Sequence, residues 1–184
     1  LYVVGSNETT RPVIEESYLR FLDRFSEHMN NGPYCFGSRP ASSDFALYGQ
    51  LTQLALTDPT PRSITIERHP RVFAWTGVVD DLSGLEVTES DWRDRADLPA
   101  TLKALFGEIG RVYVPTMLAN AAAVEAGEDS FETEVDGRPW TQPSFPYQAK
   151  CVQWIRQERA RLDGPDKQWV DEFLAGTGCE ALFQ

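Results

Sequence analysis

Apolar residues recur with helical spacing over the first third of the chain. In residues 12–30 they lie three or four positions apart, and Glu and Arg fill much of the opposite side. This pattern predicts an amphipathic helix, with Thr10 as its cap and an Asn-Asn-Gly stop at residues 30–32. The expected inner face carries Ile14, Tyr18, Phe21, Leu22, Phe25 and Met29.

A second helix is predicted from Asp44 to the break at Asp58-Pro59. Its apolar residues surround most of the circumference, so we expect it to be central and largely buried. A third helix is predicted from His69-Pro70 to its stop at Ser83-Gly84, and the charged residues 86–99 read as a connector because their periodicity is weak.

The second half of the chain predicts three further helices and one hairpin. A long helix spans residues 101–126, and Pro115 inside it predicts a kink. Alternating residues near 131–142 around Asp136-Gly137 predict a β-hairpin. Helical patterns follow at 145–162 and 165–176, so the predicted fold class is all-α, a helical bundle with one small appended hairpin.

Asp44 is a charged residue at the head of an apolar run, Phe45-Ala46-Leu47-Tyr48. A carboxylate in the first turn of a buried helix accepts hydrogen bonds from otherwise unpaired backbone N–H groups and meets the positive end of the helix dipole. In a capping box, such a side chain reaches back to the residue that caps the helix. The position therefore predicts a structural role for Asp44.

Composition narrows the classes of function. The 184-residue chain has a formal net charge of −11, which disfavours nucleic-acid and membrane-surface partners. Three distant cysteines without a CxxC pair, and only two histidines, predict free thiols in a reducing compartment and no metal site. We find no signal peptide and no membrane-spanning run, so we expect a cytoplasmic protein.

The stretch "GSRPASSDFALYGQL" at 37–51, with the amphipathic helix before it and "HPRVFAW" at 69–75 after it, carries a family resemblance. It resembles the C-terminal helical domain of glutathione S-transferases, in which Ser-x-Ala-Asp opens a buried helix as a folding and stability element. The resemblance covers residues 11–82. The remainder looks like the tail of bacterial transferase-like proteins of uncharacterised activity.

The chain departs from the family's pattern in its capping residues. Ala41 stands where the family has the capping serine, and Ser43 replaces the usual alanine. Either Ser42 caps the helix instead, or Asp44 acts alone. Loss of a serine or threonine cap costs about 1 kcal/mol, which a domain of this size tolerates.

The resemblance implies a division of labour between two domains. Glutathione would be bound as co-substrate by an upstream thioredoxin-like domain, which is expected before Leu1, since residues 1–7 read as the end of a preceding element. Residues 1–184 would form a single helical domain, with a transferase-like core at 11–84 and further helices at 101–184. This domain would shape the site of an apolar electrophilic small molecule and would be inactive without the upstream domain.

Aromatic residues and one methionine are the candidates for the wall of that electrophile site, because such side chains suit varied apolar ligands. The candidates are Tyr113, Met117, Trp140, Tyr147 and Trp154. The same residue types pack in protein cores, which is their more frequent use. No catalytic residue is predicted within the chain.

Two cations and one cysteine offer weaker candidates. Arg111 and Lys150 could bind an anionic group, but solvated charges or partners of the acidic stretch 125–136 are the more common roles. Cys151 is expected to pack as a small apolar residue, and His28 to be exposed near a helix end.

A rival hypothesis belongs to a different class of function. The same fold serves as a non-catalytic protein-association module, which would expose a sizeable apolar patch. A standalone ligand carrier would need its own apolar pocket, and the resemblance also leaves room for a homodimer. The residues upstream of the chain would distinguish an enzyme from an association module.

Overall fold

The computed structural model describes residues 5–184, so the expectation for residues 1–4 lies outside the described part. The described residues group into two compact units, which we treat separately. Residues 5–20 and 103–184 form the hairpin unit, and residues 21–102 form the Asp44 unit. Helix α1 (Arg11–His28) contributes to each, and the predicted single domain over 1–184 stays a prediction.

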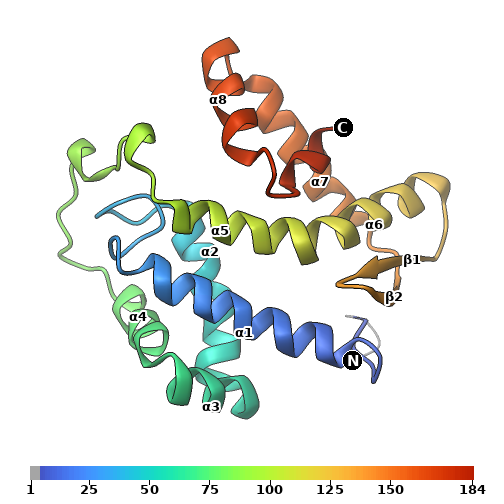
Figure 1. Cartoon of the computed structure of the whole chain (residues 1–184), viewed down its shortest axis with the longest axis horizontal. Helices are drawn as coiled ribbons and strands as arrows, with labels where there is room; N and C mark the ends of the chain where they lie inside the picture. Colours follow the sequence, from blue (N-terminus) through green and yellow to red (C-terminus); the bar gives the residue numbers. More distant parts are fainter. Residues whose placement is uncertain (1–4) are drawn as a thin grey trace. The chain divides into compact units, whose positions relative to one another are not determined.

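The elements of the Asp44 unit are helices joined by loops (Figure 1). Its elements after α1 are α2 (Ser42–Leu51), the π-helical turn η2 (Thr52–Thr57), α3 (Pro59–Arg68), α4 (Pro70–Asp80) and the short 3-10 turns η3 (Glu89–Asp91) and η4 (Arg95–Asp97). Helix α5 (Ala100–Glu108) begins in this unit. The connector predicted at 86–99 thus contains only the two short turns.

Helix α3 was not predicted, although its start carries a recognisable signal. Asp58 is the N-cap and accepts a hydrogen bond from the Thr60 N–H at 3.2 Å, while Pro59 occupies the first turn. Proline suits this position because its missing N–H would have no partner there. The Asp-Pro pair therefore ends one helix and begins the next.

The expectation that the second helix is largely buried is wrong. Within α2 and η2 only Asp44, Leu51 and Ala55 are buried, whereas Phe45 is 51% exposed. The core of the unit is instead built around Phe25 and Trp75, whose rings meet edge to face at 4.9 Å. The apolar pattern shows which side chains of a helix can be buried. Among the described residues, other elements cover only one side of α2 and η2, so the remaining apolar side chains stay exposed.

The hairpin unit combines helices with a two-stranded antiparallel sheet (Figure 1). After α5 come the π-helical turn η5 (Ile109–Tyr113), α6 (Val114–Ala126), β1 (Ser130–Val135), β2 (Arg138–Pro143), α7 (Pro146–Arg161), α8 (Gly164–Leu174) and the 3-10 turn η6 (Cys179–Phe183). Helix α6 packs against both β1 and α7. The predicted fold class, helical with one small hairpin, is confirmed.

The long helix predicted at 101–126 is interrupted by η5 directly before Pro115. Pro115 thus lies in the first turn of α6, where its missing N–H leaves no intrahelical bond unmade. Gly110 in this turn is buried, and a Cβ there would lie 1.9 Å from the Thr177 carbonyl oxygen. The glycine therefore allows the segment before η6 to pack directly on the π-helical turn.

The predicted hairpin is present, with Val135 paired to Arg138 across Asp136-Gly137. Both turn residues have positive φ, 52° and 72°, as a type I′ turn requires. The Asp136 carboxylate also accepts from Arg111 and, at 2.6 Å, from Arg20, which pairs with Glu108 at 2.8 Å. This ion-pair network ties the turn to α1, α5 and η5.

A buried asparagine fixes the junction between β2 and α7. Asn120 on α6 donates to the Phe145 carbonyl at 3.0 Å and accepts from the Phe145 N–H at 2.7 Å. Phe145 is the N-cap residue of α7. The side chain thus supplies the hydrogen bonds that a backbone segment leaving a sheet would otherwise lack.

Candidate functional site

Asp44 is completely buried and bonds to backbone on two segments. Its carboxylate accepts from the N–H of Ala41 at 2.8 Å and from the N–H of Cys35 at 2.9 Å. Ala41 is the N-cap residue and Ser42 the first helical residue, so the alternative that Ser42 caps α2 is wrong. Since alanine has no side-chain oxygen, the capping box contains only the bond from the Ala41 N–H to the Asp44 carboxylate, and Asp44 acts alone.

Asp44, Cys35 and His28 lie close together, which raises the question of nucleophilic catalysis. Burial, followed by the charge of Asp44, raises the pKa of the Cys35 thiol to about 12. A neutral, buried thiol of this kind is a poor nucleophile. The cluster therefore holds the segment around Cys35 in place and offers no reactive sulfur.

His28 is buried, so the expectation that it is exposed is wrong. Its Nε2–H donates to the Cys35 carbonyl at 3.1 Å, and its Nδ1 lies 2.9 Å from the Thr101 hydroxyl. Burial lowers the pKa of the imidazole, with Arg93 acting in the same direction. The neutral ring thus links the Cys35 carbonyl and the Thr101 hydroxyl by hydrogen bonds.

The five candidates for the electrophile wall separate into exposed and buried residues. Tyr147 is 68% exposed and Trp154 is 47% exposed, and their rings meet edge to face at 5.8 Å on α7. Tyr113, at the end of η5, is also exposed, whereas Met117 and Trp140 are buried. We name the exposed set, Tyr113, Tyr147 and Trp154, the aromatic face.

Tyr113 joins the two α7 residues through Cys151. Cys151 follows Tyr147 by four positions, on the same side of α7. Burial, followed by the charge of Cys151, raises the pKa of the Tyr113 hydroxyl, so Tyr113 lies within electrostatic reach of this side of α7. The aromatic face is therefore formed by two segments that are distant in the sequence.

Trp140 belongs to the core of the hairpin unit. It is 9% exposed and clusters with Val13, Ala123, Phe131 and Val135. Because its ring is enclosed by these side chains, it contributes to the packing of the hairpin.

The two candidate cations differ in their surroundings. Arg111 bonds to Asp136 within the turn network, so its charge is already compensated. Lys150 is exposed, and no ion pair to it is found among residues 5–184. Neither residue points to an anion site by itself.

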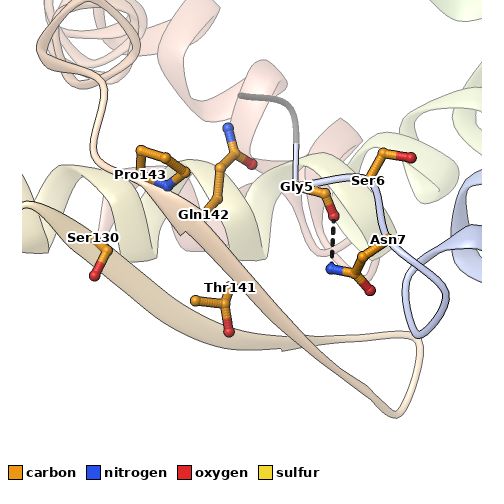
Figure 2. Close-up of a pocket in the computed structure, with 7 residues that line it drawn as sticks. All are labelled: Gly5, Ser6, Asn7, Ser130, Thr141, Gln142 and Pro143. Carbon is orange, nitrogen blue, oxygen red and sulfur yellow. Dashed lines mark hydrogen bonds between the residues drawn. The ribbon is translucent and has the colours of Figure 1, made fainter. Parts of the chain in front are cut away.

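A pocket of about 470 Å³ lies elsewhere in the hairpin unit (Figure 2). It is lined by Gly5, Ser6, Asn7, Ser130, Thr141, Gln142 and Pro143. None of the candidates predicted from the sequence lies in it. The signal that could have found it is weak, because serine, threonine and amide residues occur throughout loops and strand ends.

The family model of the glutathione S-transferase C-terminal domain matches residues 8–77. This segment is therefore similar to the C-terminal domain of glutathione S-transferases. Comparison with curated proteins and with solved structures gave no match. The transferase-like segment contains the whole His28, Cys35 and Asp44 cluster, whereas the aromatic face and the pocket's strand residues lie beyond it.

Among residues 5–184, no group of three or more histidine, cysteine or acidic side chains is arranged to hold a metal ion. No described helix is both long enough and apolar enough to cross a bilayer.

Proposed function

We propose that this chain is the C-terminal part of a bacterial, cytoplasmic glutathione transferase. An upstream thioredoxin-like domain binds and activates glutathione, and this part supplies a wall of the site for an apolar electrophile. The family match over residues 8–77 supports the first half of the proposal. The exposed aromatic face supports the second half.

The observation that carries the proposal is the exposure of Tyr147 and Trp154 in mutual ring contact. Large aromatic side chains are more often buried, because leaving their area in water forfeits about 1.5 to 3 kcal/mol each. Exposed rings that are already packed on each other present a preformed apolar surface. Such a surface accepts a flat apolar molecule with little loss of side-chain entropy.

The aromatic face is a surface, whereas binding sites for small molecules enclose most of their ligand. Under the proposal the upstream domain provides the opposite wall, and no activity is expected of the chain alone. The alternative is a protein-association module in which the same exposed rings contact a partner protein. The exposed 68% of Tyr147 is compatible with that role as well.

Calorimetry with glutathione tests the proposal. Glutathione is titrated onto this chain and onto the longer protein that includes the upstream sequence. We expect heat of binding from the longer protein only, because the thiol site lies upstream. Absence of binding to both would reject the transferase and favour the association module.

A matched pair of variants then tests the electrophile wall in the longer protein. We expect Trp154→Ala to raise KM for an apolar electrophile several-fold, while Trp169→Ala in α8 leaves KM unchanged. Equal KM values in both variants would exclude the aromatic face from the site.

A further inference from the structure

The pocket beside β2 has a fixed wall built from residues 5–7. Gly5 has φ +68°, and a Cβ at this position would lie 3.0 Å from the Trp140 ring, so only glycine fits against the indole. The Gly5 carbonyl accepts from the Thr10 hydroxyl at 2.7 Å and from Asn7 Nδ2 at 3.3 Å. Thr10 thus bonds to the turn before α1 through its hydroxyl.

Gln142 provides an oriented donor on the opposite side of the pocket. It is only 8% exposed, and its Oε1 accepts from the Trp140 indole N–H at 3.1 Å. This bond assigns the oxygen and leaves the Nε2 amide group without a hydrogen-bond partner among residues 5–184. Figure 2 shows the carboxamide and the segment Gly5–Asn7 on either side of the pocket.

The outer edge of β2 limits what can pair with it. Val135 and Arg138 flank a two-residue turn, so the bonded pairs alternate along the hairpin and the backbone of residues 139, 141 and 143 faces outward. Residues 139 and 143 are prolines and lack an N–H. Thr141 therefore offers the one outward N–H of β2, which disfavours the addition of a whole strand.

The charges around the pocket disfavour anions. Its lining residues are uncharged, but Glu132 is directly opposite Thr141 in the sheet register, and Glu128 and Asp129 immediately precede Ser130. These carboxylates are exposed, and no ion pair to them is found in the described part of the chain. A neutral ligand avoids the repulsion that a carboxylate would meet.

We propose that this pocket binds a small neutral molecule that carries an amide group, and that it recognises this group of the ligand. The ligand's carbonyl oxygen accepts from Gln142 Nε2, and the Thr141 backbone at the strand edge completes the recognition. Because its Oε1 is held by the Trp140 indole, the Gln142 carboxamide presents its Nε2 in a fixed orientation, and a ligand that accepts from it needs no reorientation of the side chain. The site lies outside the aromatic face and does not depend on the transferase proposal.

Two probes that differ at one terminal group test the proposal on the intact 184-residue chain. N-acetylglycinamide is neutral, and N-acetylglycine replaces its terminal amide by a carboxylate. With 15N-labelled protein at neutral pH, we expect N-acetylglycinamide to shift the Gln142 side-chain amide and the Thr141 backbone amide saturably. We expect N-acetylglycine to bind at least about fivefold more weakly.

Gln142→Glu is the sharpest variant, because it keeps an oxygen for the Trp140 indole and removes the free N–H donors. We expect it to weaken N-acetylglycinamide binding by about fivefold or more, which corresponds to one lost hydrogen bond. Gln153→Glu makes the same charge change at an exposed position of α7 and should leave the affinity unchanged. Unchanged backbone amide signals of Phe131 and Val135, which belong to the same core, show that Gln142→Glu has kept its fold.

Three results would overturn the proposal: no saturable shift at Gln142 and Thr141 in the parent chain, equal binding of both probes, or equal affinity in a folded Gln142→Glu variant. The titration of the parent chain decides the question even if the variant fails to fold. Because no glutathione is used, failure here leaves the transferase proposal intact, and the reverse also holds.

Discussion

The Asp44 unit and the hairpin unit use their buried polar groups differently. In the Asp44 unit, the side chains of His28 and Asp44 both bond to the backbone of Cys35. The raised pKa of the Cys35 thiol and the lowered pKa of the His28 imidazole keep both groups neutral. In the hairpin unit, Gln142 keeps a free donor in a pocket, and three aromatic side chains stay exposed. Most of the family match covers the first unit, whereas the open surfaces lie in the second.

This difference shows why a family resemblance can be secure and still say little about chemistry. The resemblance rests on Asp44 and its neighbours, whose physical task is to satisfy backbone donors at the start of a helix. The proposed binding surfaces depend on residues 5–7 and on residues after position 110, to which the family model does not extend. Four predictions test this comparison.

Asp44→Ala should have the largest effect on stability. It leaves the N–H groups of Ala41 and Cys35 without their charged acceptor, which should lower the free energy of unfolding by about 3 to 6 kcal/mol. The control is Asp58→Ala, which removes an exposed cap and should cost about 1 kcal/mol. Urea unfolding measures both, and equal losses would contradict the structural role of Asp44.

Trp140→Ala should cost about 3 to 5 kcal/mol, because it empties part of the core of the hairpin unit and removes the partner of Gln142. Trp154→Ala, on the aromatic face, should cost less than about 1 kcal/mol, since that ring is half exposed and loses one ring contact. Thermal unfolding compares the two tryptophans. A similar loss in both would mean that the aromatic face is part of the core.

Asn120→Ala should destabilise the hairpin unit by about 2 to 3 kcal/mol, because both polar backbone groups of Phe145 lose a buried partner. Asn31→Ala, at an exposed position, serves as control and should cost below about 0.5 kcal/mol. Hydrogen exchange of the first turn of α7 offers a second readout. Unchanged hydrogen exchange in this turn would contradict the role of Asn120 in holding the backbone of Phe145.

Asp136 should add a pH dependence to stability, the smallest of the four effects. Burial raises its pKa, but the bonds from Arg111 and Arg20 outweigh burial, and the net pKa is below the ordinary value. A lowered pKa in the folded state stabilises the fold above the ordinary aspartate range and loses that contribution as the pH falls through the folded pKa.

Urea unfolding between about pH 5 and pH 2 measures this dependence. Asp136→Asn should be less stable than the parent at pH 5, and the difference should shrink as the pH falls. A constant difference between the two proteins would show that the Asp136 charge does not contribute through Arg20 and Arg111.

Much of the local structure followed from the sequence, because it depends on neighbouring residues. The hairpin around Asp136-Gly137 and the helices now seen as α1, α4, α7 and α8 were all predicted. Helix α3 was not predicted, because Asp58-Pro59 is interpreted from the sequence only as the end of the preceding helix. The two π-helical turns were also missed, since nothing in a helical apolar pattern distinguishes a π-helical turn from an α-helical one.

The candidate site was predicted less well than the fold. Five residues were proposed on chemical grounds, and three of them form the aromatic face, while Met117 and Trp140 are buried. Gln142 was not proposed, because an amide next to proline in a short strand gives no signal of its own. Its significance arises only when the Trp140 indole takes its oxygen and the segment Gly5–Asn7 lines the same pocket.

The sequence by itself determined most of the helices, the hairpin and the role of Asp44 as a structural carboxylate, since these depend on spacing, turn residues and capping within a few positions. Tertiary structure alone decided that Phe45, Tyr147 and Trp154 are exposed, that His28 is buried and that Gln142 lines a pocket. The physical reason is that burial is a property of pairs of segments. A side chain's own chemistry does not specify which distant segment will cover it.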